Sequence, residues 1–102
     1  MRIVYEYISD DPKNISKYAE ALLENKNEEK IRIKISSINK NGETLFGVDS
    51  NYKEDMDSSL EFRSIDYEDI GNYLETRITE GMKSLEVAAL DGVYDVYTIN
   101  NL

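Results

Sequence analysis

The sequence predicts an α+β fold in which two helices cover a mainly antiparallel sheet of five to six strands. Several short segments alternate apolar and polar side chains, as half-buried strands do. Asn-Gly and Asp-Gly pairs separate some of these segments, and such pairs favour β-hairpins. Two other segments repeat apolar residues at helical spacing. Together these patterns predict the order β-α-β-β-β-α-β-β in a single α+β domain spanning residues 1–102, with no apparent internal repeat or linker.

The first strand and the first helix are predicted near the N-terminus. In residues 3–8, Ile3, Tyr5 and Tyr7 alternate with a second set of side chains that includes Glu6, and this pattern predicts a strand. Asp11 is expected to cap the helix, and Pro12 suits its first position because proline lacks the amide hydrogen that would be unpaired there. Asn25 and Asn27 are expected to end the helix. Its apolar stripe is expected to contain Ile15, Tyr18, Ala19, Leu22 and Leu23.

The middle of the chain predicts a hairpin, a loop and a further strand. Residues 30–38 alternate isoleucine with polar side chains and predict the clearest strand. Residues 39–42 favour a turn, because asparagine and glycine tolerate positive φ, and residues 43–49 return as the second strand. Residues 50–59 are polar and without period, which predicts a loop. Residues 60–65 resume the alternation and predict another strand.

Asp66 is expected to cap the second helix. Glu68 and Asp69 fall in its first turn, where negative charge interacts favourably with the helix dipole. The apolar stripe of this helix consists of Ile70, Tyr73, Leu74 and Ile78. Gly81 is expected to end the helix, because glycine readily adopts the left-handed conformation found there.

The last third of the chain predicts a second hairpin. Residues 84–90 alternate like a strand but also contain good helix formers. We favour a strand, because the Asp91-Gly92 pair and the β-rich residues 93–99 follow directly. A type I′ turn there would pair Leu90 with Val93. That register would place on one face Leu85, Val87, Ala89, Tyr94, Val96 and Thr98.

The composition argues against several kinds of chemistry. The chain has no cysteine and no histidine, which removes thiolate chemistry, the commonest general base and the commonest metal ligand. It contains no glycine-rich phosphate loop and no nucleophile motif. We therefore expect no catalytic residues, no metal and no cofactor. The absence of an 18-residue apolar segment predicts no membrane span, and we expect a cytoplasmic location.

Negative charge is concentrated in the C-terminal part of the chain. The net charge is −9, and 14 of the 21 acidic residues follow Lys40, where only four basic residues oppose them. This charge disfavours direct binding to nucleic acid or to an anionic membrane and favours a basic protein surface. Such a partner could be a nucleic-acid-binding protein or a nuclease complex. The residue usage is typical of an AT-rich genome, such as that of a low-GC bacterium or its phage, in which case the protein would act in the host cytoplasm.

The acidic loop and strand from Asp49 to Glu61 form the candidate partner-binding surface. Leu60 and Phe62 are predicted on one face of the strand, which places Glu61 on the other. Side chains on one strand face recur every ~6.6 Å, close to the spacing of phosphates along nucleic acid. The specific hypothesis is an inhibitor that mimics nucleic acid, as small acidic anti-CRISPR and anti-restriction proteins do. The candidate binding residues are Asp49, Tyr52, Glu54, Asp55, Asp57, Glu61 and Tyr67.

Three alternatives compete with this hypothesis. A structural or accessory subunit could assemble as a homodimer or hetero-complex through its strand edges. A metal-dependent module could use the carboxylates of residues 49–61, but Lys53 occupies a ligand position of a calcium loop and Glu54 occupies the position that needs glycine. The basic side chains of residues 30–40 could contact nucleic acid, but we interpret them as the solvent face of a strand, where lysine also prevents edge aggregation.

Overall fold

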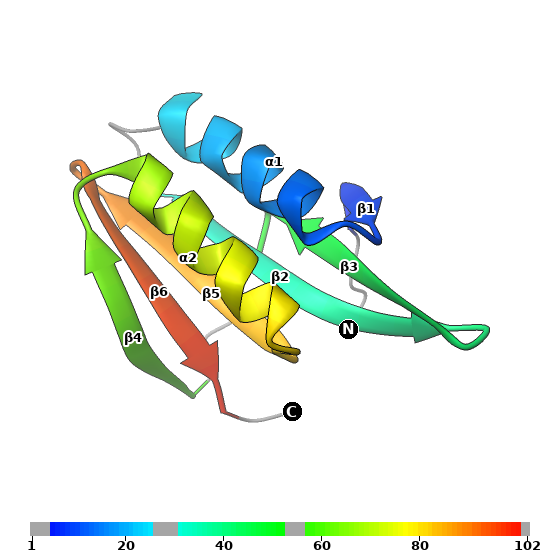
Figure 1. Ribbon diagram of the computed structural model, residues 1–102. Helices are drawn as coiled ribbons and strands as arrows, with labels where there is room; N and C mark the ends of the chain where they lie inside the picture. The colour runs from blue at the N-terminus through cyan, green and yellow to red at the C-terminus, as the bar shows by residue number, and fades with distance from the viewer. Residues whose placement is uncertain (1–4, 26–30, 53–56, 101–102) are drawn as a thin grey trace.

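The computed structural model describes residues 5–25, 31–52 and 57–100 and confirms the predicted fold class and element order. Two helices lie on one face of a six-stranded sheet (Figure 1). The strand order is β1-β3-β2-β5-β6-β4, and every neighbouring pair is antiparallel. The elements are β1 (Tyr7–Ser9), α1 (Pro12–Asn25), β2 (Ile31–Lys40), β3 (Glu43–Asp49), β4 (Ser58–Ser64), α2 (Tyr67–Thr79), β5 (Ser84–Leu90) and β6 (Val93–Ile99).

The helix ends follow from local sequence signals. The carboxylate of Asp11 accepts a hydrogen bond from the amide of Lys13, and that of Asp66 accepts one from the amide of Glu68, each at 2.9 Å. Gly81 has a φ of 93°, which non-glycine residues rarely adopt. Its amide and that of the next residue donate to carbonyl oxygens of the last turn of α2, at 3.1 and 3.2 Å. These bonds confirm both predicted N-caps and the predicted C-terminal glycine.

Two tight turns produce the predicted hairpins. Asn41 and Gly42 have φ values of 52° and 81°, and Asp91 and Gly92 have values of 54° and 78°. Positive φ at both central positions defines a type I′ turn, whose twist matches that of the flanking strands. The second turn pairs the two residues that were predicted to flank it, and residues 84–90 form a strand, as favoured.

The core lies between the two helices and the centre of the sheet. The strands contribute alternating side chains that face the helices, and the helices contribute one apolar stripe each. Completely burying one such aliphatic side chain stabilises the fold by roughly 1.5–3 kcal/mol. The fully buried residues include Ile15 and Leu23 of α1, Ile33 and Ile35 of β2, Val48 of β3, Ile70 and Leu74 of α2, Leu85 and Val87 of β5, and Val96 of β6.

The predicted alternation in β4 is wrong at one position. The pairing with β6 shifts register between Leu60 and Phe62, which is a β-bulge. Glu61 therefore points to the helix side, where it contacts Tyr73 and Arg77 of α2. Phe62 also lies on that side, with its ring stacked on Tyr73, whereas Leu60 faces the opposite side and is 48% exposed. A bulge inserts one extra residue, so alternation read from sequence alone fails across it.

The sheet consists of two β-α-β-β units with the same topology. The first comprises β1, α1, β2 and β3, and the second comprises β4, α2, β5 and β6. In each unit the first strand pairs with the third, so β1 and β4 form the two edges of the sheet and β2 and β5 meet at its centre. The units join where β2 pairs with β5, and Ile35 lies opposite Leu85 in that pair. The two helices lie side by side in opposite directions (Figure 1), which completes an approximate two-fold relation.

A weak sequence repeat underlies the two units, so the expectation of no internal repeat is wrong. Residues 6–20 match residues 61–75 with a shift of 55, whereas the two hairpin turns differ by 50. No single shift aligns both parts, so the repeat in the sequence is confined to the first strand and helix of each unit, and the topology extends it to the hairpins. The identical pairs are Glu6 and Glu61, Ser9 and Ser64, Asp11 and Asp66, Ile15 and Ile70, Tyr18 and Tyr73, and Glu20 and Glu75.

The repeated residues make the same contacts in both units. In the first unit, the rings of Tyr7 and Tyr18 are stacked with centroids 4.5 Å apart, and the Tyr18 hydroxyl donates to Glu6. Stacked rings beside a carboxylate acceptor thus fasten the helix to the first strand of the unit. The same arrangement recurs in the second unit with Glu61, Phe62 and Tyr73.

Candidate functional site

The structure places the start of the predicted acidic surface on the sheet face opposite the helices, called the open face below. Asp49 ends β3 and lies opposite Lys34 of β2. Tyr52 follows, is only 7% exposed, and has its ring 5.3 Å from the ammonium group of Lys34. Tyr52 therefore covers a strand lysine and does not present its ring to a partner. Glu54 and Asp55 lie outside the described residues.

Asp57 and Tyr67 lie apart from this face and from each other. Asp57 is exposed just before β4, and its carbonyl oxygen accepts a hydrogen bond of 2.8 Å from the amide of Asn100. Tyr67 begins α2, and its hydroxyl donates to Glu24 of α1 at 3.1 Å, which joins the two helices. That hydrogen bond to a carboxylate raises the pKa of Tyr67. The described members of the predicted site therefore do not converge on one surface.

Glu61 has its hydrogen-bonding capacity used within the fold. Its carboxylate accepts from Arg77 Nε at 2.7 Å, from the Tyr73 hydroxyl at 2.8 Å and from the Thr98 hydroxyl. Burial and the hydrogen bond to this carboxylate raise the pKa of Tyr73. Because Glu6 makes the corresponding contact in the first unit, we interpret Glu61 as a structural residue of the repeated unit. The repeat is the one sequence signal that could have identified it.

A different group of carboxylates converges on the outer surface of the helices. Glu20 and Glu24 lie in the second half of α1, and Asp66 and Glu68 lie at the start of α2, beside them. We call these four residues the acidic helix patch. Burial is the main cause that raises the pKa of Glu20; Lys17 lowers this pKa, and the other three carboxylates each raise it by less. Sequence reasoning missed the patch because it depends on how the two helices pack.

Gly71 allows Glu20 to approach α2 closely. A Cβ atom at this position would overlap the carboxyl group of Glu20. The equivalent position in α1 is Ser16, which is buried and donates to the carbonyl oxygen of Lys13. The two units therefore differ at this helix contact, and only the second offers space for a carboxylate.

The described arginines are paired with carboxylates elsewhere in the fold. Pairing a carboxylate with arginine lowers its pKa, as the hydrogen bond from Arg63 does for Asp95. The described arginines thus neutralise carboxylates of the sheet and of its β4 edge, and none of them is paired with the acidic helix patch, where Lys17 opposes the charge of Glu20. The shortest distances in these pairs are 2.9 Å for Arg32 and Glu86, 2.5 Å for Arg63 and Asp95, and 2.7 Å for Arg77 and Glu61.

Other kinds of site find no support in the described part of the chain. No three side chains of the types that bind metals come together among residues 5–25, 31–52 and 57–100. No helix within these ranges is long and apolar enough to cross a membrane. No protein-family model matches the chain, and no curated protein or solved structure is significantly similar to it.

Proposed function

We propose that this protein is a non-catalytic binding protein whose acidic helix patch contacts a basic surface of a partner protein. The observation that carries the proposal is the convergence of Glu20, Glu24, Asp66 and Glu68 from two helices. Like charges that approach one another destabilise the free protein. A partner that supplies lysine or arginine side chains would offset this repulsion. The carboxylates that destabilise the free protein would therefore stabilise the complex.

The physical properties of the patch determine how such binding would behave. One pair of opposite charges at 4 Å contributes about 1 kcal/mol in water and about 4 kcal/mol near a protein surface. Salt screens these interactions over about 8 Å at physiological ionic strength, so the affinity would fall as salt rises. Tyr67 lies beside the patch, is partly buried against the core, and donates its hydroxyl hydrogen to Glu24.

The more specific form of the proposal is an inhibitor that mimics nucleic acid. The chain is small and acidic, and it lacks the residue types of most active sites. These properties support an anti-CRISPR or anti-restriction type of inhibitor, phage-encoded and acting in the host cytoplasm. Its target would be the basic groove of a nucleic-acid-binding protein, which the acidic helix patch would occupy in place of phosphates.

A charge-matched pair of variants tests the proposal. The patch variant combines Glu20→Gln, Glu24→Gln, Asp66→Asn and Glu68→Gln, and asparagine retains the N-cap at position 66. The control variant neutralises four other acidic residues, namely Glu43, Glu75, Glu80 and Asp91. Both variants lose the same charge, so a nonspecific electrostatic effect would appear in both.

Each protein is immobilised, and the proteins that it retains from a host lysate are quantified at rising salt. We expect a basic protein that elutes with salt from the wild type and from the control, but is absent from the patch variant. Retention by the patch variant, or equal loss in both variants, would contradict the proposal. Displacement of the retained protein by duplex DNA or by RNA would support the nucleic-acid mimic specifically.

A further inference from the structure

A hollow on the open face of the sheet carries positive charge, although the protein as a whole is strongly acidic. Its volume is about 370 Å³, and none of the described residues that line it is acidic. It lies on the opposite side of the sheet from the acidic helix patch. Its polar lining includes Tyr5, Lys34, Ser36, Asn39, Lys83 and Ser84.

Lys34 is one of the two lysines that line this hollow. It lies in β2, is only 7% exposed, and lies opposite Asp49 in β3 and Glu86 in β5. Glu86 is paired with Arg32 at 2.9 Å, and the carboxylate of Asp49 accepts the backbone amide two residues further on. Among the described residues, no carboxylate lies within ion-pair distance of the Lys34 ammonium group. The Tyr52 ring, whose centroid is 5.3 Å from this ammonium group, offsets part of the cost of burying it, and an anionic ligand would supply hydrogen-bond acceptors.

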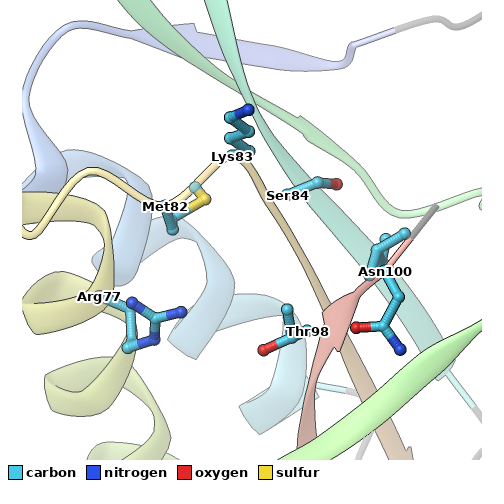
Figure 2. A pocket seen from close by; sticks show the side chains of 7 residues that line it. Arg77, Met82, Lys83, Ser84, Thr98 and Asn100 are labelled. Atoms are coloured by element: carbon cyan, nitrogen blue, oxygen red, sulfur yellow. The ribbon is translucent and has the colours of Figure 1, made fainter. Parts of the chain in front are cut away.

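Two hydroxyl groups and a second lysine lie beside Lys34. Ser36 and Ser84 are paired across β2 and β5, both are at least nine-tenths buried, and their hydroxyl oxygens are 3.4 Å apart. This distance is long for a hydroxyl hydrogen bond, and only one of the two hydroxyl groups can donate in it, so at least one hydroxyl hydrogen remains for a ligand oxygen. Lys83 and Ser84 also line a neighbouring hollow of about 380 Å³ (Figure 2). In that view the Lys83 side chain extends away from Arg77 and Thr98.

We infer that the hollow around Lys34, Ser36, Lys83 and Ser84 binds a small molecule through a phosphate or carboxylate group. Two ammonium groups and two hydroxyl groups provide the donors that such an anion requires. The volume is in the range of small-molecule sites. No acidic side chain is among the described lining residues, and the nearby Glu86 is paired with Arg32. The inference is independent of the proposed partner-binding function, because it uses the other face of the sheet.

Titration of the full-length protein with simple anions tests the inference. Inorganic phosphate and citrate are added in separate arms, at constant ionic strength maintained with sodium chloride. Binding is followed by amide chemical shifts in NMR spectra. We expect saturable shifts, centred on residues 34–37 and 83–84, with Kd on the order of 1 mM for at least one anion. A response to phosphate alone or to citrate alone identifies the ligand class.

Lysine variants locate the site. Lys83→Met should weaken binding by about fivefold or more, the loss that corresponds to about 1 kcal/mol. Lys40→Met is the matched control, because Lys40 is exposed beyond the hollow at the end of β2 and carries the same charge. Lys34→Met should abolish binding, and a thermal melt checks that it folds. Should it fail to fold, Lys83→Met decides the question.

Three outcomes would overturn the inference. The first is an absence of saturable shifts up to about 20 mM of either anion, a concentration well above the expected dissociation constant. The second is saturable shifts centred outside residues 34–37 and 83–84. The third is equal affinity of Lys83→Met and Lys40→Met for the anion that binds.

Discussion

Replacing Glu61 with alanine tests whether this residue is structural. Its side chain is 17% exposed and accepts hydrogen bonds from Arg77, Tyr73 and Thr98. A hydrogen bond to a charged group contributes about 1.5–3 kcal/mol and a neutral one about 1 kcal/mol. Water replaces part of this loss because the site is partly exposed. We therefore expect Glu61→Ala to lower the free energy of unfolding by about 3 kcal/mol.

Urea denaturation followed by circular dichroism measures this loss. With a slope of about 1–3 kcal/mol per molar urea, the midpoint should fall by about 1–3 M. Glu80→Ala is the matched control, because Glu80 contacts the same arginine at 3.5 Å but its side chain is 59% exposed. It should cost less than about 0.5 kcal/mol. A similar small cost for Glu61→Ala would refute the structural interpretation and restore Glu61 as a candidate for partner binding.

Three further predictions concern backbone conformation and pH. Gly81→Ala should destabilise the protein by about 1–2 kcal/mol in urea denaturation, because alanine is strained at a φ of 93°; an unchanged midpoint would contradict this. The pKa of Glu20 is raised above 4.5, so its ionisation destabilises the folded state as pH rises through that raised pKa. Glu20→Gln should therefore raise Tm at pH 7 but not at pH 4. Equal changes in Tm at the two pH values would show that the ionisation of Glu20 is not the cause. The pKa of Asp95 is lowered below 3.8, chiefly by the hydrogen bond from Arg63. The ionised Asp95 therefore stabilises the folded protein fully at any pH above the pKa of this group in the unfolded chain, and the stabilisation is lost as the pH falls through the lowered pKa. Arg63→Met should lower Tm at pH 7 and have progressively less effect as the pH approaches 2, whereas a pH-independent loss would indicate packing alone.

The features that sequence predicted correctly depend on a few neighbouring residues. Asp66 caps a helix through the amide two residues later, and the turn at Gly92 depends on the φ values of two residues. The orientation of Glu61 could not be predicted this way, because the bulge in β4 arises from pairing with β6, more than 30 residues away. The approach of Glu20 to Glu68 likewise results from packing between two helices. Local interactions thus determined the elements, and distant ones determined the candidate site.

The two-fold relation between the units has a consequence for assembly. The units meet at the β2–β5 strand pair and at the α1–α2 contact, and a single connection between β3 and β4 links them. Two molecules could exchange their second units and rebuild each of these contacts between chains without new surface complementarity. Such domain-swapped dimers cost little beyond the entropy of association. Refolding at high protein concentration should therefore favour exchange over unrelated aggregation, and shortening the connection would shift the balance further toward the exchanged form.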